Sequence, residues 1–236
     1  MELNSLIQQG YFLKYLRKND VSEFTHIFCG SHSVKGAWCP NCQKPLLRFL
    51  ALDTNDPKFG LEKTTLQWLS LFFCWTCEIA QAPFYYRFAA NGDVELMKYG
   101  EGGVQLNFPT ENYPIFFPQA YFQLQPLTEK EQATIKGLNR DEIDEDEMDR
   151  KSLHLNQPEH QIGGEPFLVQ KNPDYQTDTW GKETLTCPKC KKLMPFLAAI
   201  GEKTRGKQGF SGNEYVQVIF NYCKRDRIVC AFQQCD

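Results

Sequence analysis

The chain has 236 residues, of which 42% are hydrophobic and 14% aromatic. This is enough apolar surface for one large or two small folded domains, and it excludes a disordered chain. The formal net charge of −3 disfavours a dedicated nucleic-acid binder and a protein attracted to anionic membranes.

The N-terminal region predicts a short helix and gives no sign of export. Leucines and an isoleucine recur at helical spacing over residues 1–20. The same stretch lacks the basic and apolar segments of a secretory signal, and the apolar run at 64–77 is too short to span a bilayer. We therefore expect a cytoplasmic protein, in which CxxC pairs usually bind metal or carry out redox chemistry.

Two cysteine pairs in the first half have the spacing of a zinc site. Cys39-Pro-Asn-Cys42 has the form of a zinc knuckle, a tight turn whose thiolates converge on one ion. Cys74-Trp-Thr-Cys77 follows after 31 intervening residues, a distance that a strand-loop-strand excursion can close. The four thiolates are predicted to hold one structural Zn²⁺. The nearby His26, Cys29 and His32 are a further source of ligands, although packed side chains would give the same pattern.

Strands are predicted around these pairs. Apolar runs at 46–52 and 66–73 indicate two buried strands. The runs at 84–90 and 94–99 flank an Asn-Gly-Asp turn and predict a β-hairpin. The Gly, Pro and aromatic residues of 100–126 predict irregular structure packed against the sheet.

A connector separates the two halves. Thr128 and Glu131 form a capping-box pattern, so a helix should begin there. Residues 141–149 contain seven acidic residues among nine and predict a solvated linker or helix. Beyond the connector, paired glycines at 163–164 allow left-handed backbone before a short strand. The basic stretch 203–207 is expected to be a solvated turn.

A second set of ligands repeats the first. Cys187-Pro-Lys-Cys190 is a third knuckle, and Cys223 follows after 32 residues. Asp226 stands at the place of the fourth cysteine, so this site needs Asp226, Cys230 or Cys235 as its last ligand, or has lost its metal. Phe49-Leu-Ala also matches the Phe-Leu-Ala at 196–198 after a gap of one residue, so the chain is predicted to be internally duplicated.

These patterns together predict an α+β, predominantly β protein with duplicated antiparallel sheets and zinc-ribbon-like knuckles. The expected parts are a β-rich half with zinc knuckles at 1–126, an acidic, partly helical connector at 127–158 and a related β-rich half at 159–236.

Three stretches carry a family resemblance: Ile162-Gly-Gly-Glu-Pro-Phe-Leu-Val-Gln170, the knuckle of Cys187 with the Phe-Leu that follows, and Ile228-Val-Cys-Ala-Phe-Gln-Gln-Cys235. Together they resemble the YwqG-like domains of unknown function and the programmed cell death protein 2 family. The knuckle at Cys39 and the aromatic strand ending at Cys77 are similar to the latter. The resemblance implies a repeated β-rich fold and a chaperone role toward a basic ribosomal protein of the small subunit.

The leading hypothesis is a zinc-stabilised, non-enzymatic protein-interaction module, a chaperone or adaptor for a basic protein. No nucleophile and base motif points to an enzyme. The alternatives are a thiol-redox enzyme that uses a CxxC pair and a zinc-ribbon nucleic-acid binder. The oligomeric state is left open.

Overall fold

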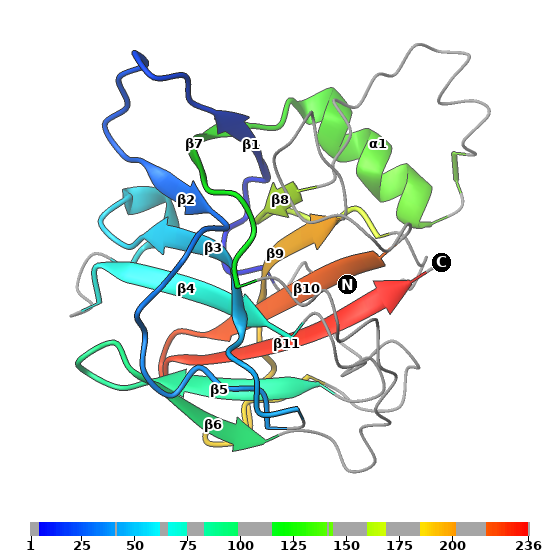
Figure 1. Cartoon of the computed structure of the whole chain (residues 1–236). Helices are drawn as coiled ribbons and strands as arrows, with labels where there is room; N and C mark the ends of the chain where they lie inside the picture. The colour runs from blue at the N-terminus through cyan, green and yellow to red at the C-terminus, as the bar shows by residue number, and fades with distance from the viewer. Residues whose placement is uncertain are drawn as a thin grey trace.

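The structure is a computed structural model of the whole chain and describes residues 5–40, 42–61, 66–74, 83–98, 115–140, 142–143, 160–168, 185–201 and 216–235. Within these ranges eleven strands form one antiparallel sheet in the order β4-β3-β2-β7-β1-β8-β9-β10-β11-β5-β6 (Figure 1). The strands are β1 Tyr11–Tyr15, β2 His26–Phe28, β3 Leu47–Asp53, β4 Trp68–Phe73, β5 Phe84–Phe88, β6 Val94–Lys98, β7 Ala120–Pro126, β8 His160–Ile162, β9 Phe196–Gly201, β10 Val216–Cys223 and β11 Ile228–Cys235. The described helices are η1 Pro57–Phe59 and α1 Glu129–Asn139.

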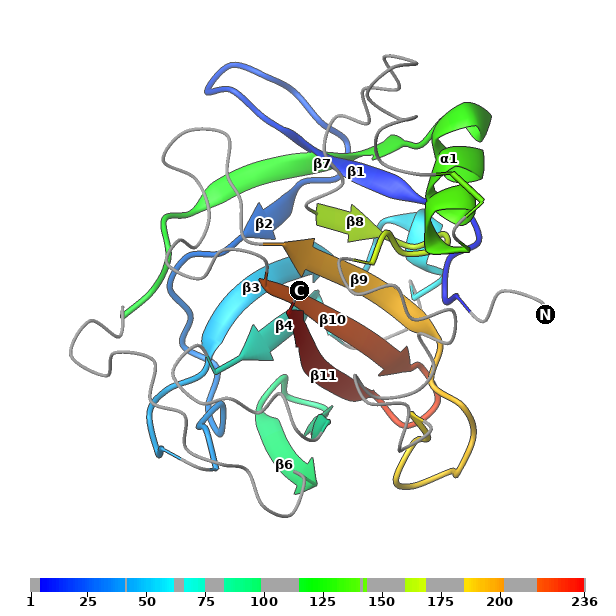
Figure 2. The ribbon, with the colours of Figure 1, turned by 90° about the vertical axis from the view of Figure 1, so that its right-hand side faces the viewer.

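The sheet is curled around an aromatic core. β4, at one end of the strand order, contacts β11 near the other end (Figures 1 and 2). Phe49 of β3 lies inside the curl with its ring centroid 6.4 Å from Phe73, 5.8 Å from Phe117 and 6.4 Å from Phe220. Edge-to-face and tilted rings at such distances stabilise a core beyond their buried area.

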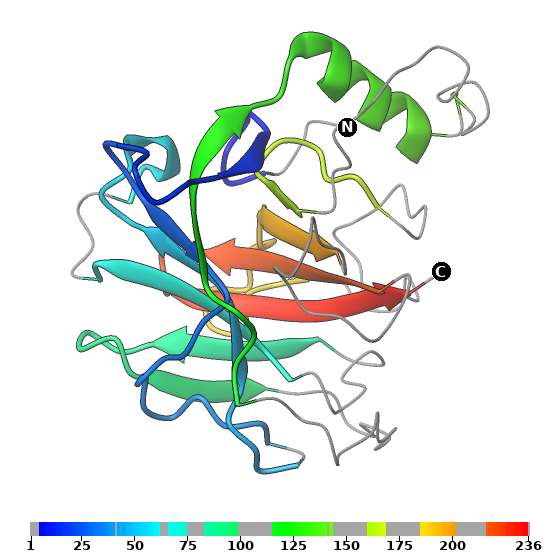
Figure 3. The same cartoon turned by 45° about the horizontal axis from the view of Figure 1, so that its top comes forward.

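The helix α1 follows β7 and lies beside β1 and β8, which are in the middle of the strand order (Figure 3). Thr128 caps it, because its hydroxyl accepts from the Glu131 amide while the Glu131 carboxylate accepts from the Thr128 amide. Ile135 and Leu138 are buried against Phe12 of β1. No helix formed by the described residues is long and apolar enough to cross a membrane.

Two three-strand units have the same register. We call β2, β3 and β4 the first unit and β8, β9 and β10 the second unit. Aligned partners across the strands are Phe28, Leu50 and Leu71 in the first unit and Ile162, Ala198 and Phe220 in the second. Each middle strand has one extra residue as a bulge, Phe49 in β3 and Leu197 in β9. By strand register, Phe49 therefore corresponds to Leu197. The sequence comparison matches Phe49 with Phe196 after a gap of one residue, and the register needs no such gap.

The two halves of the chain share this sheet. β7 lies next to β1 between the two units, and β5 of the first half pairs with β11 of the second. The sequence predicts duplicated antiparallel sheets; the structure has one antiparallel sheet, because these pairings join both halves in a single hydrogen-bonded ladder. The division of the chain at 127–158 stays a prediction.

The predicted strands, the hairpin and the start of α1 are confirmed, but three local expectations were wrong. The segment expected to be a helix contains β1, because pairing with β7 and β8 outweighs its helical spacing. Residues 120–126 form the regular strand β7. The paired glycines are left-handed, at φ 65° and 66°, but the short strand β8 precedes them. Most of the acidic stretch 141–149 and all of 203–207 lie outside the described residues.

Gly36 offers a test of this packing. Its φ is +78°, and a Cβ there would overlap the Val94 carbonyl oxygen of β6. We expect Gly36→Ala to lower the free energy of unfolding by at least about 2 kcal/mol, measured by urea denaturation.

Gly92→Ala is the matched control for this substitution. Gly92 also has positive φ, +86°, but its added Cβ would meet only Leu66, at 3.8 Å. The control should lose about 1 kcal/mol. Equal losses in the two variants would mean that the Val94 contact does not contribute.

Candidate metal centres

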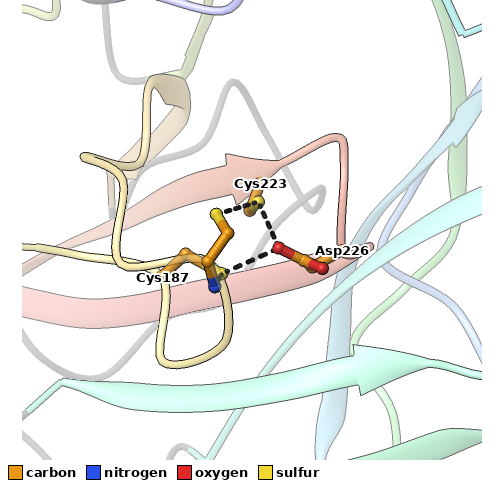
Figure 4. Close-up of side chains that lie close together, drawn as sticks. Cys187, Cys223 and Asp226 are labelled. Atoms are coloured by element: carbon orange, nitrogen blue, oxygen red, sulfur yellow. Dashed lines mark hydrogen bonds between the residues drawn. The ribbon is translucent and has the colours of Figure 1, made fainter.

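Four possible ligands meet at the knuckle end of the second unit. Cys187 and Cys190 lie in the turn before β9, Cys223 ends β10, and Asp226 lies in the turn that leads to β11. Figure 4 shows the Asp226 carboxylate pointing toward Cys187 and Cys223. The ligand atoms of all four residues lie within 4.8 Å of one another, so the group could hold a metal ion.

The spacing of these atoms fits a tetrahedral ion. The Cys190 and Cys223 sulfurs are 3.7 Å apart, and Asp226 Oδ2 lies 3.5 Å from the Cys187 sulfur and 3.6 Å from that of Cys223. A disulfide would need about 2.05 Å. Zinc–sulfur bonds of about 2.3 Å place two sulfurs of a tetrahedron about 3.8 Å apart. The sulfurs are therefore at ligand spacing and are not bonded to each other.

Burial keeps the thiols of Cys187 and Cys223 neutral when no cation is bound. Desolvation raises the pKa of Cys187 and raises the pKa of Cys223 to about 12. Hydrogen bonds from Cys190, Cys187 and Cys223 lower the pKa of Asp226, whose Oδ1 also lies 3.7 Å from Lys189 Nζ. A metal ion would replace the thiol protons and supply the positive charge that this cluster of sulfur and carboxylate ligands lacks.

The first unit has the corresponding group at its own knuckle end. Cys39 and Cys42 precede β3, Cys74 follows β4, and their three sulfurs lie within 4.8 Å of one another. The Cys42 and Cys74 sulfurs are 3.7 Å apart, the same distance as in the second unit. This group could also hold a metal ion. Cys77, predicted as its fourth ligand, lies outside the described residues.

The knuckle turns themselves are alike. In the first, the Cys39 amide donates to the Lys44 carbonyl at 2.8 Å and the Gln43 amide donates to the Cys39 carbonyl at 3.0 Å. Gln43 has a left-handed φ of 59°. In the second turn the Cys187 amide donates to the Lys192 carbonyl at 2.8 Å, and the Lys191 amide donates to the Cys187 carbonyl at 2.9 Å. Lys191 has a left-handed φ of 60°. These bonds hold each pair of sulfurs on one side of a closed turn.

The two other candidates for the last ligand lie elsewhere. Cys230 is fully buried in the middle of β11, paired with Asn221 and Tyr85, and is outside the metal group. Cys235 pairs through its backbone with Val216, at the opposite end of β10 from Cys223. Asp226 is therefore the fourth residue of this group among the described residues.

The histidines near the first knuckle are packed side chains. His26 Nδ1 accepts from the Asp53 amide at 3.1 Å, and His26 Nε2 lies 3.3 Å from Asp56 Oδ2. Burial lowers the pKa of His26. His32 Nε2 donates to the Leu46 carbonyl at 2.8 Å, and Cys29 is fully buried. As far as the structure describes the chain, none of the three belongs to a metal group.

Sequence reasoning missed a cavity of about 620 Å³ at the β4 edge of the sheet. Arg48, Ser70 and Trp68 line it together with the loop 31–34 and the hairpin turn 90–93. These segments carry no shared motif, so only the folded sheet shows that they meet.

Comparison with known proteins gives no relative. No family model, no curated protein and no solved structure matches the chain.

Proposed function

We propose that the chain binds two structural zinc ions, one at each knuckle. The observation that carries this proposal is the 3.7 Å separation of paired sulfurs in both groups, which is ligand spacing for tetrahedral zinc. Cys77 would complete a four-thiolate first site, and Asp226 would complete a second site with three thiolates and one carboxylate. The softness of three thiolates favours zinc over calcium or magnesium.

We further propose that the two units are internal repeats. Their strand register, their bulges and the hydrogen bonds of their knuckle turns correspond position by position. The constant offset of 148 residues between Cys39 and Cys187, and between Phe49 and Leu197, supports a duplication of strands together with ligands.

The folded, zinc-stabilised chain would act as a non-enzymatic interaction module, a chaperone or adaptor for a basic protein such as a ribosomal protein. The buried thiols of Cys187 and Cys223, whose pKa values are raised, support a structural role, since a thiol nucleophile needs a lowered pKa. The net charge of −3 favours a basic partner through charge complementarity.

The first experiment is native mass spectrometry of the protein purified gently from its own cells. We expect a mass increase of two zinc ions and a co-purifying basic protein. A mass increase of one zinc ion would mean that only one of the two sites binds metal. A metal-free chain with disulfides would contradict the zinc proposal. Two zinc ions with no protein partner at any concentration would contradict the interaction role alone.

A further inference from the structure

The cavity beside β4 lies at an edge of the sheet that no described strand covers. β4 is the outermost strand at its end of the order, and the cavity runs along Trp68 and Ser70 of this strand. Across it lies the turn between β5 and β6, at Ala90–Asp93. The space is therefore a slot with two sides and not an open, flat edge.

The main chain of β4 presents hydrogen-bonding groups to this slot. The Thr54 amide donates to the Gln67 carbonyl, so antiparallel alternation turns the amides and carbonyls of Trp68 and Ser70 away from β3. The Tyr86 hydroxyl already serves two outward groups, accepting from the Phe72 amide at 2.8 Å and donating to the Ser70 carbonyl at 3.4 Å. Within the described residues, no hydrogen bond is found to the outward groups of Trp68 or to the Ser70 amide.

The second unit shows what occupies this position elsewhere in the same fold. The residues of β10 that correspond to Trp68, Ser70 and Phe72 are Gln217, Ile219 and Asn221. There the strand β11 lies alongside, with Gln234, Phe232 and Cys230 as the respective partners. The first unit has no such strand at its β4 edge in the described part of the chain. An added strand would restore the pairing that β11 supplies to β10.

The side chains that line the cavity in the first unit differ from those at the corresponding positions of the second unit, and the difference indicates the kind of ligand. Phe196 and Ile219 fill the face of the second unit together with Phe232. The corresponding positions of the first unit hold Arg48 and Ser70, which leave a polar space. A residue of an added strand opposite Ser70 would take the place of Phe232 and point toward Arg48.

The guanidinium of Arg48 has no acidic partner in the part of the chain that the structure describes. Its Nε donates to the Cys29 carbonyl at 3.0 Å, and among the described residues it forms no salt bridge. It is half-buried, and desolvation lowers its pKa. A partly desolvated cation at the base of a slot is stabilised by an incoming carboxylate.

We propose that β4 binds an extended peptide segment that pairs with the main-chain groups of Trp68 and the amide of Ser70 and places an acidic side chain on Arg48. The inference rests on the proposed interaction role and names one contact of the partner. Main-chain pairing provides affinity in this mode, and the single carboxylate provides specificity. A partner that is basic overall can still bind in this way if the segment that pairs with β4 contains one acidic residue.

The test is selection of randomised linear peptides on the zinc-loaded 236-residue chain, followed by binding measurements with synthetic copies of the enriched peptides. We expect enriched peptides to have an acidic residue flanked by strand-forming residues. Arg48→Gln should weaken their binding at least about ten-fold. Ser70→Ile, which installs the residue of the second unit, should fill the slot and abolish binding.

The controls separate this contact from the fold and from the zinc sites. Arg87 of β5 is ion-paired with Glu95 of β6 and does not line the cavity. Arg87→Gln therefore removes a cation outside the slot and should leave peptide binding unchanged. All variants should keep the zinc content and melting temperature of the parent.

Three outcomes would overturn the proposal. These are no enriched peptide, peptides that bind Ser70→Ile as well as the parent, and a dimer of the chain that Ser70→Ile dissociates. The last would mean that a second copy occupies the edge. Unchanged zinc content in any of these cases would leave the proposed zinc role standing.

Discussion

Replacing Cys39 by serine is expected to abolish cooperative folding and not simply to reduce partner binding. Structural zinc contributes about 10–16 kcal/mol in small zinc-dependent folds, whereas whole domains are stable by about 5–15 kcal/mol. Cys39 is fully buried, and a metal ion held by Cys39, Cys42 and Cys74 would join the turn before β3 to the end of β4. Circular dichroism on heating, with zinc counted by mass spectrometry, measures the effect.

Cys230→Ser is the matched control for this experiment. Cys230 is as fully buried as Cys39 but lies in β11 outside both metal groups. We expect it to lose about 1–3 kcal/mol through burial of a hydroxyl and to keep both zinc ions. If Cys39→Ser melts like the parent and retains two zinc ions, the structural role of the first site is wrong.

The parts of the fold that could be predicted are those set by local chemistry. The CxxC spacing identified the groups at Cys39 and Cys187, because a knuckle turn needs only its own few residues to bring two sulfurs together. The Asn-Gly turn between β5 and β6 and the cap at Thr128 are local in the same sense. Each was recognised from a handful of neighbouring residues.

The strand order could not be predicted in this way. β1 has helical spacing but forms a strand because β7 and β8 pair with both of its edges. The sequence contains no signal that places residues 11–15 beside 120–126. The same holds for the slot at β4, which exists because Arg48 and Ser70 face a space that no described strand covers.

The two metal groups have the same place in the fold. Each joins the segment before the middle strand of a unit to the end of the next strand, with 31 residues enclosed in the first case and 32 in the second. A metal ion there would cross-link both ends of a β-hairpin and limit the freedom of the unfolded chain. The hairpins β3-β4 and β9-β10 would then be fixed even though other parts of the curled sheet meet only through long-range pairing.

The second site is expected to hold its zinc less tightly than the first, and Asp226→Cys should remove this difference. A fourth thiolate would replace a carboxylate that is shared with Lys189, 3.7 Å away, and structural zinc sites favour sulfur. We expect the variant to slow zinc release to a chromogenic chelator at least about ten-fold at this site, since even outer-shell changes alter metal affinity by about 10–100-fold. Asp226→Asn should accelerate the release.

Asp20→Cys, which adds a thiol at an exposed position away from both groups, is the control and should release zinc like the parent. If Asp226→Cys and Asp226→Asn both release zinc at the parental rate, Asp226 is not a ligand and the second site is completed by another residue. Because the first site has its own knuckle, its slower release should stay unchanged in all three variants. The two phases of zinc loss can then be assigned to the first and the second unit.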